Sequence, residues 1–256
     1  MAAISFVAGG EPMTAIRLGF SMFALQASIG ALNDIVDAPR DAGRKPGKPI
    51  PAGLVSRTVA QAVVVSAAVV GIALSLPSGP LTVALAVAVL VIGYAYDLAA
   101  KGTAWSWLPF AIGIPLLPIF AWYGTTAALP AFFRVLVPAA VGAGAALAIA
   151  NARADLERDV AAGIDSIAIR LGHDRAWLAS TTLFAIIAVV AVVTMLMAGA
   201  PTATVIGALS GIALIGIGVD AGRNRSPRHL ERAWEFDAIG VAFLAAAWLA
   251  GIAAAG

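Results

Sequence analysis

Cysteine is absent from the 256-residue chain, and charged residues make up only 12% of it. The absence of cysteine excludes disulfides, thiolate metal sites and thiol catalysis. Soluble domains carry about 25% charged residues, so this charged fraction argues against a soluble globular protein. The net charge is +2, and the basic residues form no run on a polar domain, which argues against a nucleic-acid partner.

Hydrophobic residues make up 61% of the chain, and the mean hydropathy is +0.94. They lie in long continuous runs rather than in alternation, which favours membrane-spanning helices over a barrel. A span needs about 20 apolar residues. The sequence therefore predicts an all-α membrane protein, a single domain over 1–256 with eight full spans around an apolar cavity. The charge-free stretches are 18–33, 58–96, 102–133, 135–152, 176–219 and 238–256.

Breaks between paired spans are expected where proline and glycine interrupt the longest apolar stretches. These breaks are Pro77–Pro80, Gly124–Pro130 and Gly199–Pro201. Each interval between charge clusters then holds one helix pair, so all the clusters lie on one side of the membrane. That side carries 14 of the 16 Lys and Arg residues, which predicts that it faces the cytoplasm. The clusters are 34–57, 97–101, 153–175 and 220–237.

Two matching acidic motifs begin where predicted spans leave the membrane. Each has the pattern Asn-x-x-x-Asp-x-x-x-Asp, and residues four apart lie on one face of a helix. Pro39 can bend or end the first helix, which makes the position of Asp41 the least certain. The recurrence suggests two similar halves. The first acidic motif is Asn33, Asp37 and Asp41, and the second is Asn151, Asp155 and Asp159.

Carboxylates at this spacing repel one another and need cations. Oxygen ligands without His or Cys favour Mg²⁺ or Mn²⁺, and Mg²⁺ completes its shell with water and phosphate oxygens. Basic residues beside the motifs supply donors for phosphate. The combination predicts a diphosphate head group held at the polar face, with an isoprenyl chain among the helices. The predicted phosphate-binding residues are Arg44, Lys45, Lys48, Arg153, Arg158 and Arg170.

Simpler explanations exist for several of these residues. The acidic motifs could be ordinary solvated loops, and Arg44, Lys45 and Lys48 could serve membrane topology or lipid head groups. Arg153 and Arg158 could form salt bridges with Asp155, Glu157 or Asp159. The cluster from Arg223 to Asp237 is interpreted as a polar loop without a chemical role.

These motifs resemble those of the UbiA family of intramembrane prenyltransferases, over most of the chain from about residue 13. The resemblance rests on four segments that match the family pattern together. Ser166 stands where the family has Thr. The segments are NDIVDAPRD (33–41), KPGKPIPAGLVS (45–56), Tyr96-DLAA-Lys101 and DLERDVAAGIDSIAIRLG (155–172).

The resemblance implies Mg²⁺-dependent transfer from a polyprenyl diphosphate to a lipophilic acceptor, with an aromatic or quinone precursor favoured. A glycerol-based lipid, a tetrapyrrole and a sugar phosphate stay open as acceptors. The resemblance places metal on Asn33, Asp37, Asp41, Asp155 and Asp159; the spacing alone adds Asn151. It also gives Tyr96 and Lys101 a place near the diphosphate, although Lys101 could instead pair with Asp97. The residues expected to act in catalysis are Asp34, Asp37, Asp155, Tyr96 and Lys101.

One departure from the family concerns the number of spans. The family usually has nine, with two before the first acidic motif, whereas 32 residues precede Asn33 here. The expectation is that the first family helix is missing or truncated. Two other classes of function therefore stay open: a non-catalytic relative and a membrane transporter. Transporters usually carry ionisable residues near the bilayer midplane, and the predicted spans here are uncharged.

Overall fold

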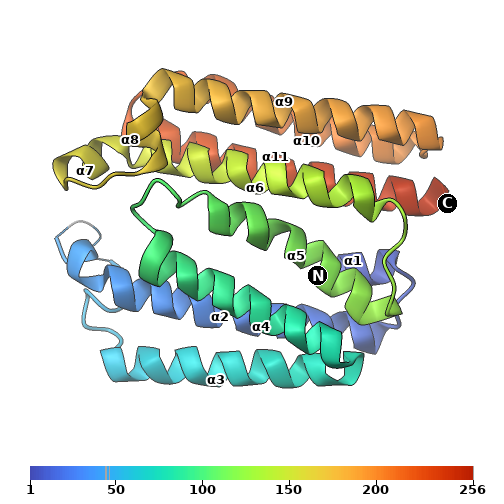
Figure 1. The fold of residues 1–256 in the computed structure, drawn as a ribbon, viewed down its shortest axis with the longest axis horizontal. Coiled ribbons are helices and arrows are strands. Elements are labelled where there is room, and N and C mark those ends of the chain that lie inside the picture. Colours follow the sequence, from blue (N-terminus) through green and yellow to red (C-terminus); the bar gives the residue numbers. More distant parts are fainter. Residues whose placement is uncertain (44, 46, 256) are drawn as a thin grey trace. The chain divides into compact units, whose positions relative to one another are not determined.

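The structure is a computed structural model, and it describes residues 1–43, 45 and 47–255. Every regular element in those residues is a helix, as the ribbon in Figure 1 shows. The α-helices are α1 (Ala2–Val7), α2 (Pro12–Asp41), α3 (Arg57–Ser75), α4 (Pro80–Ala95), α5 (Leu108–Thr126), α6 (Phe133–Ala154), α7 (Leu156–Ala161), α8 (Ile167–Leu171), α9 (His173–Ala198), α10 (Thr202–Ala221) and α11 (Pro227–Ala255). A 3₁₀ turn, η1 (Leu76–Ser78), and a π-helix, η2 (Tyr96–Ala100), extend α3 and α4.

Within the described residues, eight helices are long and apolar enough to cross a membrane, which confirms the predicted number. They are α2, α3, α4, α5, α6, α9, α10 and α11. The predicted breaks are also confirmed: α4 starts at Pro80, α5 ends at Thr126 and α9 ends at Ala198. Proline in the first turn of a helix costs no hydrogen bond, which explains the start of α4.

The chain divides into two compact units. The first unit contains Met1–Ala100 and Leu116–Leu129, and the second contains Lys101–Pro115 and Pro130–Gly256. The boundary falls inside α5, which contributes to both. The first acidic motif belongs to the first unit and the second acidic motif to the second, so each motif is described within its own unit.

In the first unit, α2 packs against α3 and α4 around a small apolar core. Leu18, Leu25 and Phe120 are completely buried there. Hydroxyl groups connect α2 to α3, because Ser21 Oγ donates to the carbonyl of Gly71 at 2.6 Å. Small and hydroxyl-bearing residues at helix contacts are typical of membrane bundles, where close backbone approach replaces hydrophobic exclusion from water.

In the second unit, α10 and α11 form the most extensive helix pair, and α6 and α9 pack beside them. Two glycines allow the close approach of α10 and α11. A Cβ atom on Gly211 would lie 2.6 Å from the backbone nitrogen of Leu244, and one on Gly240 would lie 2.7 Å from the carbonyl oxygen of Gly211. No larger side chain fits at either position without a backbone shift.

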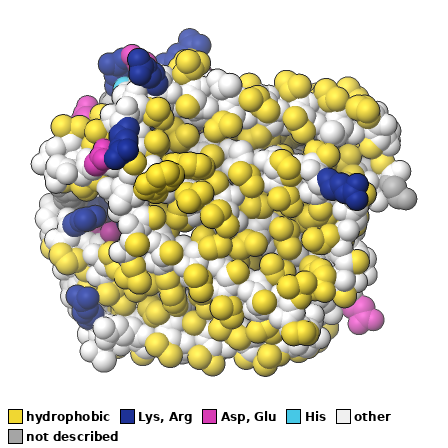
Figure 2. Space-filling view, viewed as in Figure 1, with side chains coloured by type: hydrophobic (Ala, Val, Ile, Leu, Met, Phe, Trp, Pro, Cys, Tyr) yellow, Lys and Arg dark blue, Asp and Glu magenta, His cyan; other side chains and the backbone are white. Residues whose placement is uncertain are grey.

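Hydrophobic side chains cover much of the visible surface, and the charged side chains in view lie at helix ends (Figure 2). Large apolar residues are strongly exposed on the spans, among them Phe23 at 71% and Met197 at 83%. Such exposure is unfavourable in water and suits contact with lipid. The surface thus agrees with the multi-pass membrane class that the sequence indicated.

Candidate functional site

The first acidic motif lies on the last turns of α2, which continues through Pro39 to Asp41. The proline therefore does not end the helix. Asn33, Asp37 and Asp41 remain one turn apart on a continuous helix, as the spacing predicted. Asn33, Asp34 and Asp37 are partly buried, and Asp41 is only 8% exposed.

Asn33 has a specific partner that the sequence did not indicate. Its side-chain Nδ2 donates a 2.6 Å hydrogen bond to Oδ1 of Asp97. Asp97 is buried in the π-helix η2, at the end of α4. Because the amide nitrogen of Asn33 is engaged there, the amide oxygen is the atom left to act as a cation ligand.

Lys48 connects Asp41 of the first acidic motif to the neighbouring Asp34. Its Nζ lies 3.0 Å from Asp34 Oδ1 and 2.7 Å from Asp41 Oδ2. Partial burial of the ammonium lowers the pKa of Lys48, but the hydrogen bonds and charges of Asp41 and Asp34 outweigh that effect, so the pKa is raised overall. In this arrangement Lys48 offsets part of the negative charge of Asp34 and Asp41. Diphosphate binding by Lys48 stays a prediction.

The remaining predicted residues of this region lie near the ends of α2 and α4. Lys45 is exposed, and its backbone N–H donates to the carbonyl of Asp41 at 2.9 Å. Arg44 lies outside the described residues. Tyr96 is partly buried at the start of η2, and Lys101, also partly buried, follows the π-helix as the first residue of the second unit. Roles for these residues near a diphosphate stay predictions.

The second acidic motif does not lie on one helix. α6 ends at Ala154, Asp155 takes a non-helical conformation (φ −97°, ψ 1°), and α7 begins at Leu156. The backbone N–H of Asp159 nevertheless donates to the carbonyl of Asp155 at 2.8 Å, which keeps these two residues one turn apart. Asn151 belongs to the last turn of α6. The continuous helical stripe that the spacing predicted is therefore interrupted at Asp155.

Arg158 and Arg170, both predicted to bind phosphate, form ion pairs in this structure. Arg158 donates to Asp155 at 2.9 Å and to Glu231 of α11 at 3.1 Å. The hydrogen bond to Glu231 contributes most to the raised pKa of Arg158. Arg170 donates to Asp165, and that bond holds the pKa of the exposed Asp165 carboxyl below its ordinary value. Arg158 therefore forms the salt bridge to Asp155 that the sequence allowed, and a second salt bridge to Glu231.

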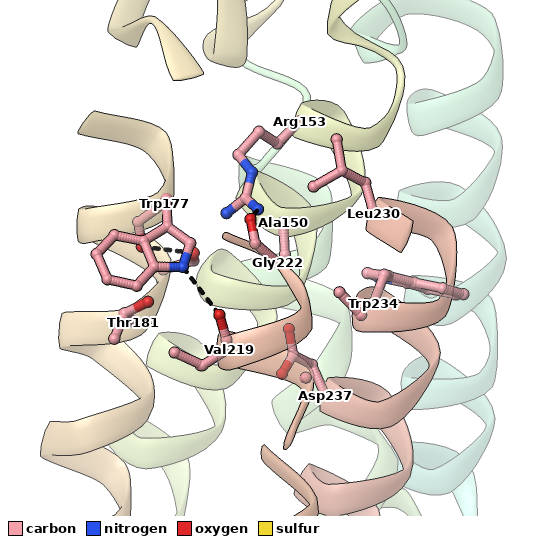
Figure 3. A pocket seen from close by; sticks show the side chains of 12 residues that line it. Ala150, Arg153, Trp177, Thr181, Val219, Gly222, Leu230, Trp234 and Asp237 are labelled. Atoms are coloured by element: carbon pink, nitrogen blue, oxygen red, sulfur yellow. Dashed lines mark hydrogen bonds between the residues drawn. The ribbon is translucent and has the colours of Figure 1, made fainter. Parts of the chain in front are cut away.

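Arg153 lies in a cavity inside the second unit (Figure 3). It is 4% exposed, and its Nη2 donates to the carbonyl oxygen of Gly222 at the end of α10. Asp237 of α11, also 4% exposed, lines the same cavity. Diphosphate binding by Arg153 would require the guanidinium to leave Gly222. From the sequence, Arg153 could form a salt bridge with Asp155, Glu157 or Asp159. In the structure its partner is the carbonyl oxygen of Gly222 instead.

The segment from Arg223 to Asp237 is mostly helical rather than a loop, which corrects the interpretation from sequence. α10 ends at Ala221 and α11 already begins at Pro227. Leu230, Ala233 and Asp237 recur at helical spacing and are all buried. That periodicity is the signal in the sequence that places Asp237 on the buried face of a helix. The many charged residues around it obscure the pattern.

Charged residues gather at one end of each unit. In the second unit, Arg225 beyond α10 pairs with Asp174 at the start of α9 at 2.6 Å, close to the ends that Arg153 and Arg158 connect. In the first unit, the bond between Asn33 and Asp97 places the ends of α2 and α4 together. Arg17, at the other end of α2, donates to the carbonyl of Leu74 and to Ser78. Within the units, α3 packs against α4 and α9 against α10, as predicted for the stretches 58–96 and 176–219.

The donors at both motifs are of the kind that Mg²⁺ prefers. They are carboxylate and amide oxygens, and no Cys is present. Among the described residues, no three Asp, Glu or His side chains gather tightly enough to hold one ion. The carboxylate and amide oxygens themselves suit Mg²⁺ better than zinc, because Mg²⁺ usually takes one or two carboxylates and completes its shell with water and phosphate oxygens.

Fold and motifs define a multi-pass helical membrane protein with two carboxylate motifs at helix ends. The family model described as the UbiA prenyltransferase family matches residues 1–247. The chain therefore belongs to the UbiA prenyltransferase family, as the resemblance implied. A digeranylgeranylglyceryl phosphate synthase of Methanoregula boonei is 31% identical over 173 residues. The match covers 65% of this chain and 60% of that relative.

Solved structures share the fold. The apo structure of a UbiA homologue from Aeropyrum pernix K1 has a TM-score of 0.74 at 19% identity, over 95% of this chain and 93% of that one. A UbiA homologue from Archaeoglobus fulgidus bound to GPP and Mg²⁺ has a TM-score of 0.71 at 18% identity, over 95% and 94%. A structure of digeranylgeranylglyceryl phosphate synthase covers 99% of this chain and 92% of its own, with a TM-score of 0.72 and 17% identity.

Proposed function

We propose that this chain transfers a prenyl group from a polyprenyl diphosphate to a lipophilic acceptor and releases diphosphate, in a Mg²⁺-dependent reaction. The observation that carries the proposal is the pair of acidic motifs at helix ends. Each motif presents carboxylates one helical turn apart, and both motifs lie in the part of this chain that the UbiA family model matches. The GPP and Mg²⁺ bound to the homologue from Archaeoglobus fulgidus support the same donor class.

Asn33, Asp37 and Asp41 would hold Mg²⁺ in the first unit, and Asn151, Asp155 and Asp159 would hold Mg²⁺ in the second. When bound, Mg²⁺ would supply charge neutralisation for the departing diphosphate. Oxygen ligands of this kind suit the ion, and its remaining ligands would be diphosphate oxygens and water. Asp34 lies beside this set and holds Lys48.

The basic residues would orient the diphosphate. Lys48, poised on Asp34 and Asp41, can exchange a carboxylate for a phosphate oxygen, and Tyr96 and Lys101 would donate to the diphosphate from the segment after α4. Arg158, held by Asp155 and Glu231, carries a guanidinium at the edge of the second motif. Fixed positive charge of this type stabilises negative charge that develops as a bond breaks.

The reaction breaks the allylic C–O bond, and its electron pair leaves with the diphosphate. An electron pair of the acceptor forms the new bond to the same carbon, and the acceptor releases a proton. Apolar helix surfaces around the prenyl chain would exclude water and so suppress hydrolysis of the carbocation-like carbon.

The acceptor class separates two versions of this function. The sequence led to an aromatic or quinone precursor. The relative from Methanoregula boonei bears a name that contains a glyceryl phosphate, which favours a glycerol-phosphate lipid as the second candidate. Both are lipophilic nucleophiles, and the family alone does not choose between them.

A turnover screen tests the proposal. Purified protein in lipid is incubated with radiolabelled geranyl or longer prenyl diphosphates and one acceptor of each class, with Mg²⁺ or with EDTA. We expect labelled product and released diphosphate only with Mg²⁺ and one acceptor class. Wild-type protein that releases no diphosphate with any donor would favour a non-catalytic relative, and solute flux in proteoliposomes without transfer would favour a transporter.

We also propose that the charged ends face the cytoplasm, because 14 of the 16 Lys and Arg residues belong to them. The absence of cysteine makes this easy to test with single cysteines and a membrane-impermeant maleimide. Ala162→Cys, beyond α7, and Ala128→Cys, between α5 and α6, are matched exposed positions. In intact cells we expect labelling of Ala128→Cys alone; labelling of Ala162→Cys alone would reverse the orientation.

A further inference from the structure

The cavity in the second unit contains a set of buried polar atoms that the proposed reaction does not use. It lies among α6, α9, α10 and α11 (Figure 3). Four side-chain atoms that line it are buried and form no hydrogen bond within the described structure. They are Arg153 Nε, Thr181 Oγ1, Trp234 Nε1 and Asp237 Oδ1. A buried polar group without a partner is costly, so four at one place call for a ligand.

Gly218 of α10 and Gly222, directly after α10, make room for the two charged groups. A Cβ atom on Gly218 would collide with Asp237 Oδ1, and one on Gly222 would lie 2.8 Å from Arg153 Nη2. The backbone N–H of Gly222 donates to the carbonyl of Gly218 at 2.8 Å, so the two glycines are one helical turn apart. The guanidinium and the carboxylate therefore lie against two glycines that are about 6 Å apart along the helix axis.

Arg153 Nε and Asp237 Oδ1 form no hydrogen bond with each other or with any other described atom, so a single bridging molecule can connect them. The free space in the cavity has room for about one water molecule. A buried water usually makes two to four hydrogen bonds, and this cavity offers an N–H of Arg153, an N–H of Trp234, the Thr181 hydroxyl and the Asp237 carboxylate. Both donors and acceptors are present, as a water molecule requires.

We propose that one buried water joins Arg153 to Asp237, and that this water-bridged charge pair positions the second acidic motif. Arg153 is on the last turn of α6, between Asn151 and Asp155. Its guanidinium attaches that turn to Gly222 of α10 and, through the water, to α11. Because α6 ends directly before Asp155, this attachment fixes the position of the Asp155 backbone. The positioning role rests on the proposed function, whereas the charge pair stands independently of it.

Thermal unfolding in detergent tests the charge pair without reference to activity. Arginine stays charged when its partner is removed, whereas an aspartic acid can accept a proton. Asp237→Asn is therefore expected to lower Tm more than Arg153→Met. Adding Arg153→Met to Asp237→Asn should raise Tm again, because it removes the uncompensated buried charge. The matched control is Arg232→Met, an exposed arginine of α11, which should give no such recovery. Equal effects of Arg153→Met in both backgrounds would overturn the pair.

Ion binding by the folded double variant tests the positioning role. Mn²⁺ is titrated in the presence of inorganic diphosphate and followed by electron paramagnetic resonance. We expect the wild type to bind, and the double variant with recovered Tm to bind about 10-fold more weakly or worse, as loss of outer-shell support usually does. Equal binding by both proteins would overturn the positioning role alone. No binding by the wild type would count against the proposed function, and the unfolding result would still decide the pair.

An experimental structure that resolves ordered water tests the bridge directly. One water within hydrogen-bond distance of Arg153 Nε and Asp237 Oδ1 is expected. A direct contact between the two side chains, or an apolar molecule in the cavity, would overturn it.

Discussion

The side-chain amide of Asn33 donates a 2.6 Å hydrogen bond to the carboxylate of Asp97. The two residues are 64 positions apart in the chain and lie on the ends of different helices. This bond assigns the two ends of the Asn33 amide: the nitrogen points to Asp97, and the oxygen is left for a cation. Asp97 thus acts on the first acidic motif from outside it.

Replacement of Asp97 by leucine is expected to weaken Mg²⁺ binding. Without the acceptor, the Asn33 amide can rotate, and loss of an outer-shell partner typically costs 10- to 100-fold in metal affinity. Asp97→Asn keeps an acceptor oxygen and should retain most of the affinity. The measurement is the Mg²⁺ concentration at half-maximal turnover, with Tm to check folding. The prediction fails if the folded leucine variant has the half-saturation of the wild type.

Loss of either motif's central carboxylate should abolish transfer while the protein stays folded. Asp37→Ala and Asp155→Ala are each expected to reduce turnover at least about 100-fold, because each removes a proposed ligand. Diphosphate release from a labelled donor is the measurement. Asp220→Ala, which removes an exposed carboxylate at the end of α10, is the control and should leave turnover unchanged. Wild-type turnover in Asp155→Ala would refute its proposed role.

The contribution of Lys48 to stability should depend on pH at the alkaline end. The pKa of Lys48 is raised from 10.5 in the folded protein, so its contribution is complete below about pH 10 and is lost as the pH rises through the raised pKa. Lys48→Met is expected to cost about 1 kcal/mol or less at pH 8, because the pair is partly exposed. Unfolding of both proteins across pH 8–12 would measure this. A difference that grows above pH 11 would contradict the assignment.

Close contact of α10 and α11 should make Gly211 intolerant of larger residues. Gly211→Val places a side chain where the backbone of Leu244 lies, and overpacking of this kind costs about 1–3 kcal/mol or more. Gly216→Val is a matched control on the same helix, because a Cβ atom there meets nothing within 4 Å. We expect Gly211→Val to lower Tm more than Gly216→Val. An equal decrease in Tm for the two variants would show that the contact at Gly211 does not limit stability.

The spans were predictable because each depends on local composition. About 20 apolar residues between charged clusters suffice to cross a bilayer, and Pro80 and Pro201 mark helix starts by their own covalent geometry. The first acidic motif was predictable for the same reason, because four-residue spacing on a helix is a local property. The course of α2 through Pro39 was not, because local rules allow both a bend and an end there.

The partners of the charged side chains depended on the packing of distant segments. Asp97 contacts Asn33, Glu231 holds Arg158, and Gly222 accepts from Arg153. No local spacing brings any of these pairs together. The interruption of the second motif at Asp155 is likewise a property of the folded chain, since the sequence around it reads as a continuous helix.

The sequence by itself determined the membrane class, the number of spans, the family and the two acidic motifs, because hydrophobicity and helical periodicity act over a few neighbouring residues. Only the tertiary structure decided which basic side chains are committed to partners and which polar groups are buried together. Burial and pairing depend on contacts between helices that are far apart in the chain. At such contacts, glycines such as Gly218 and Gly222 leave space for the charged side chains of Asp237 and Arg153.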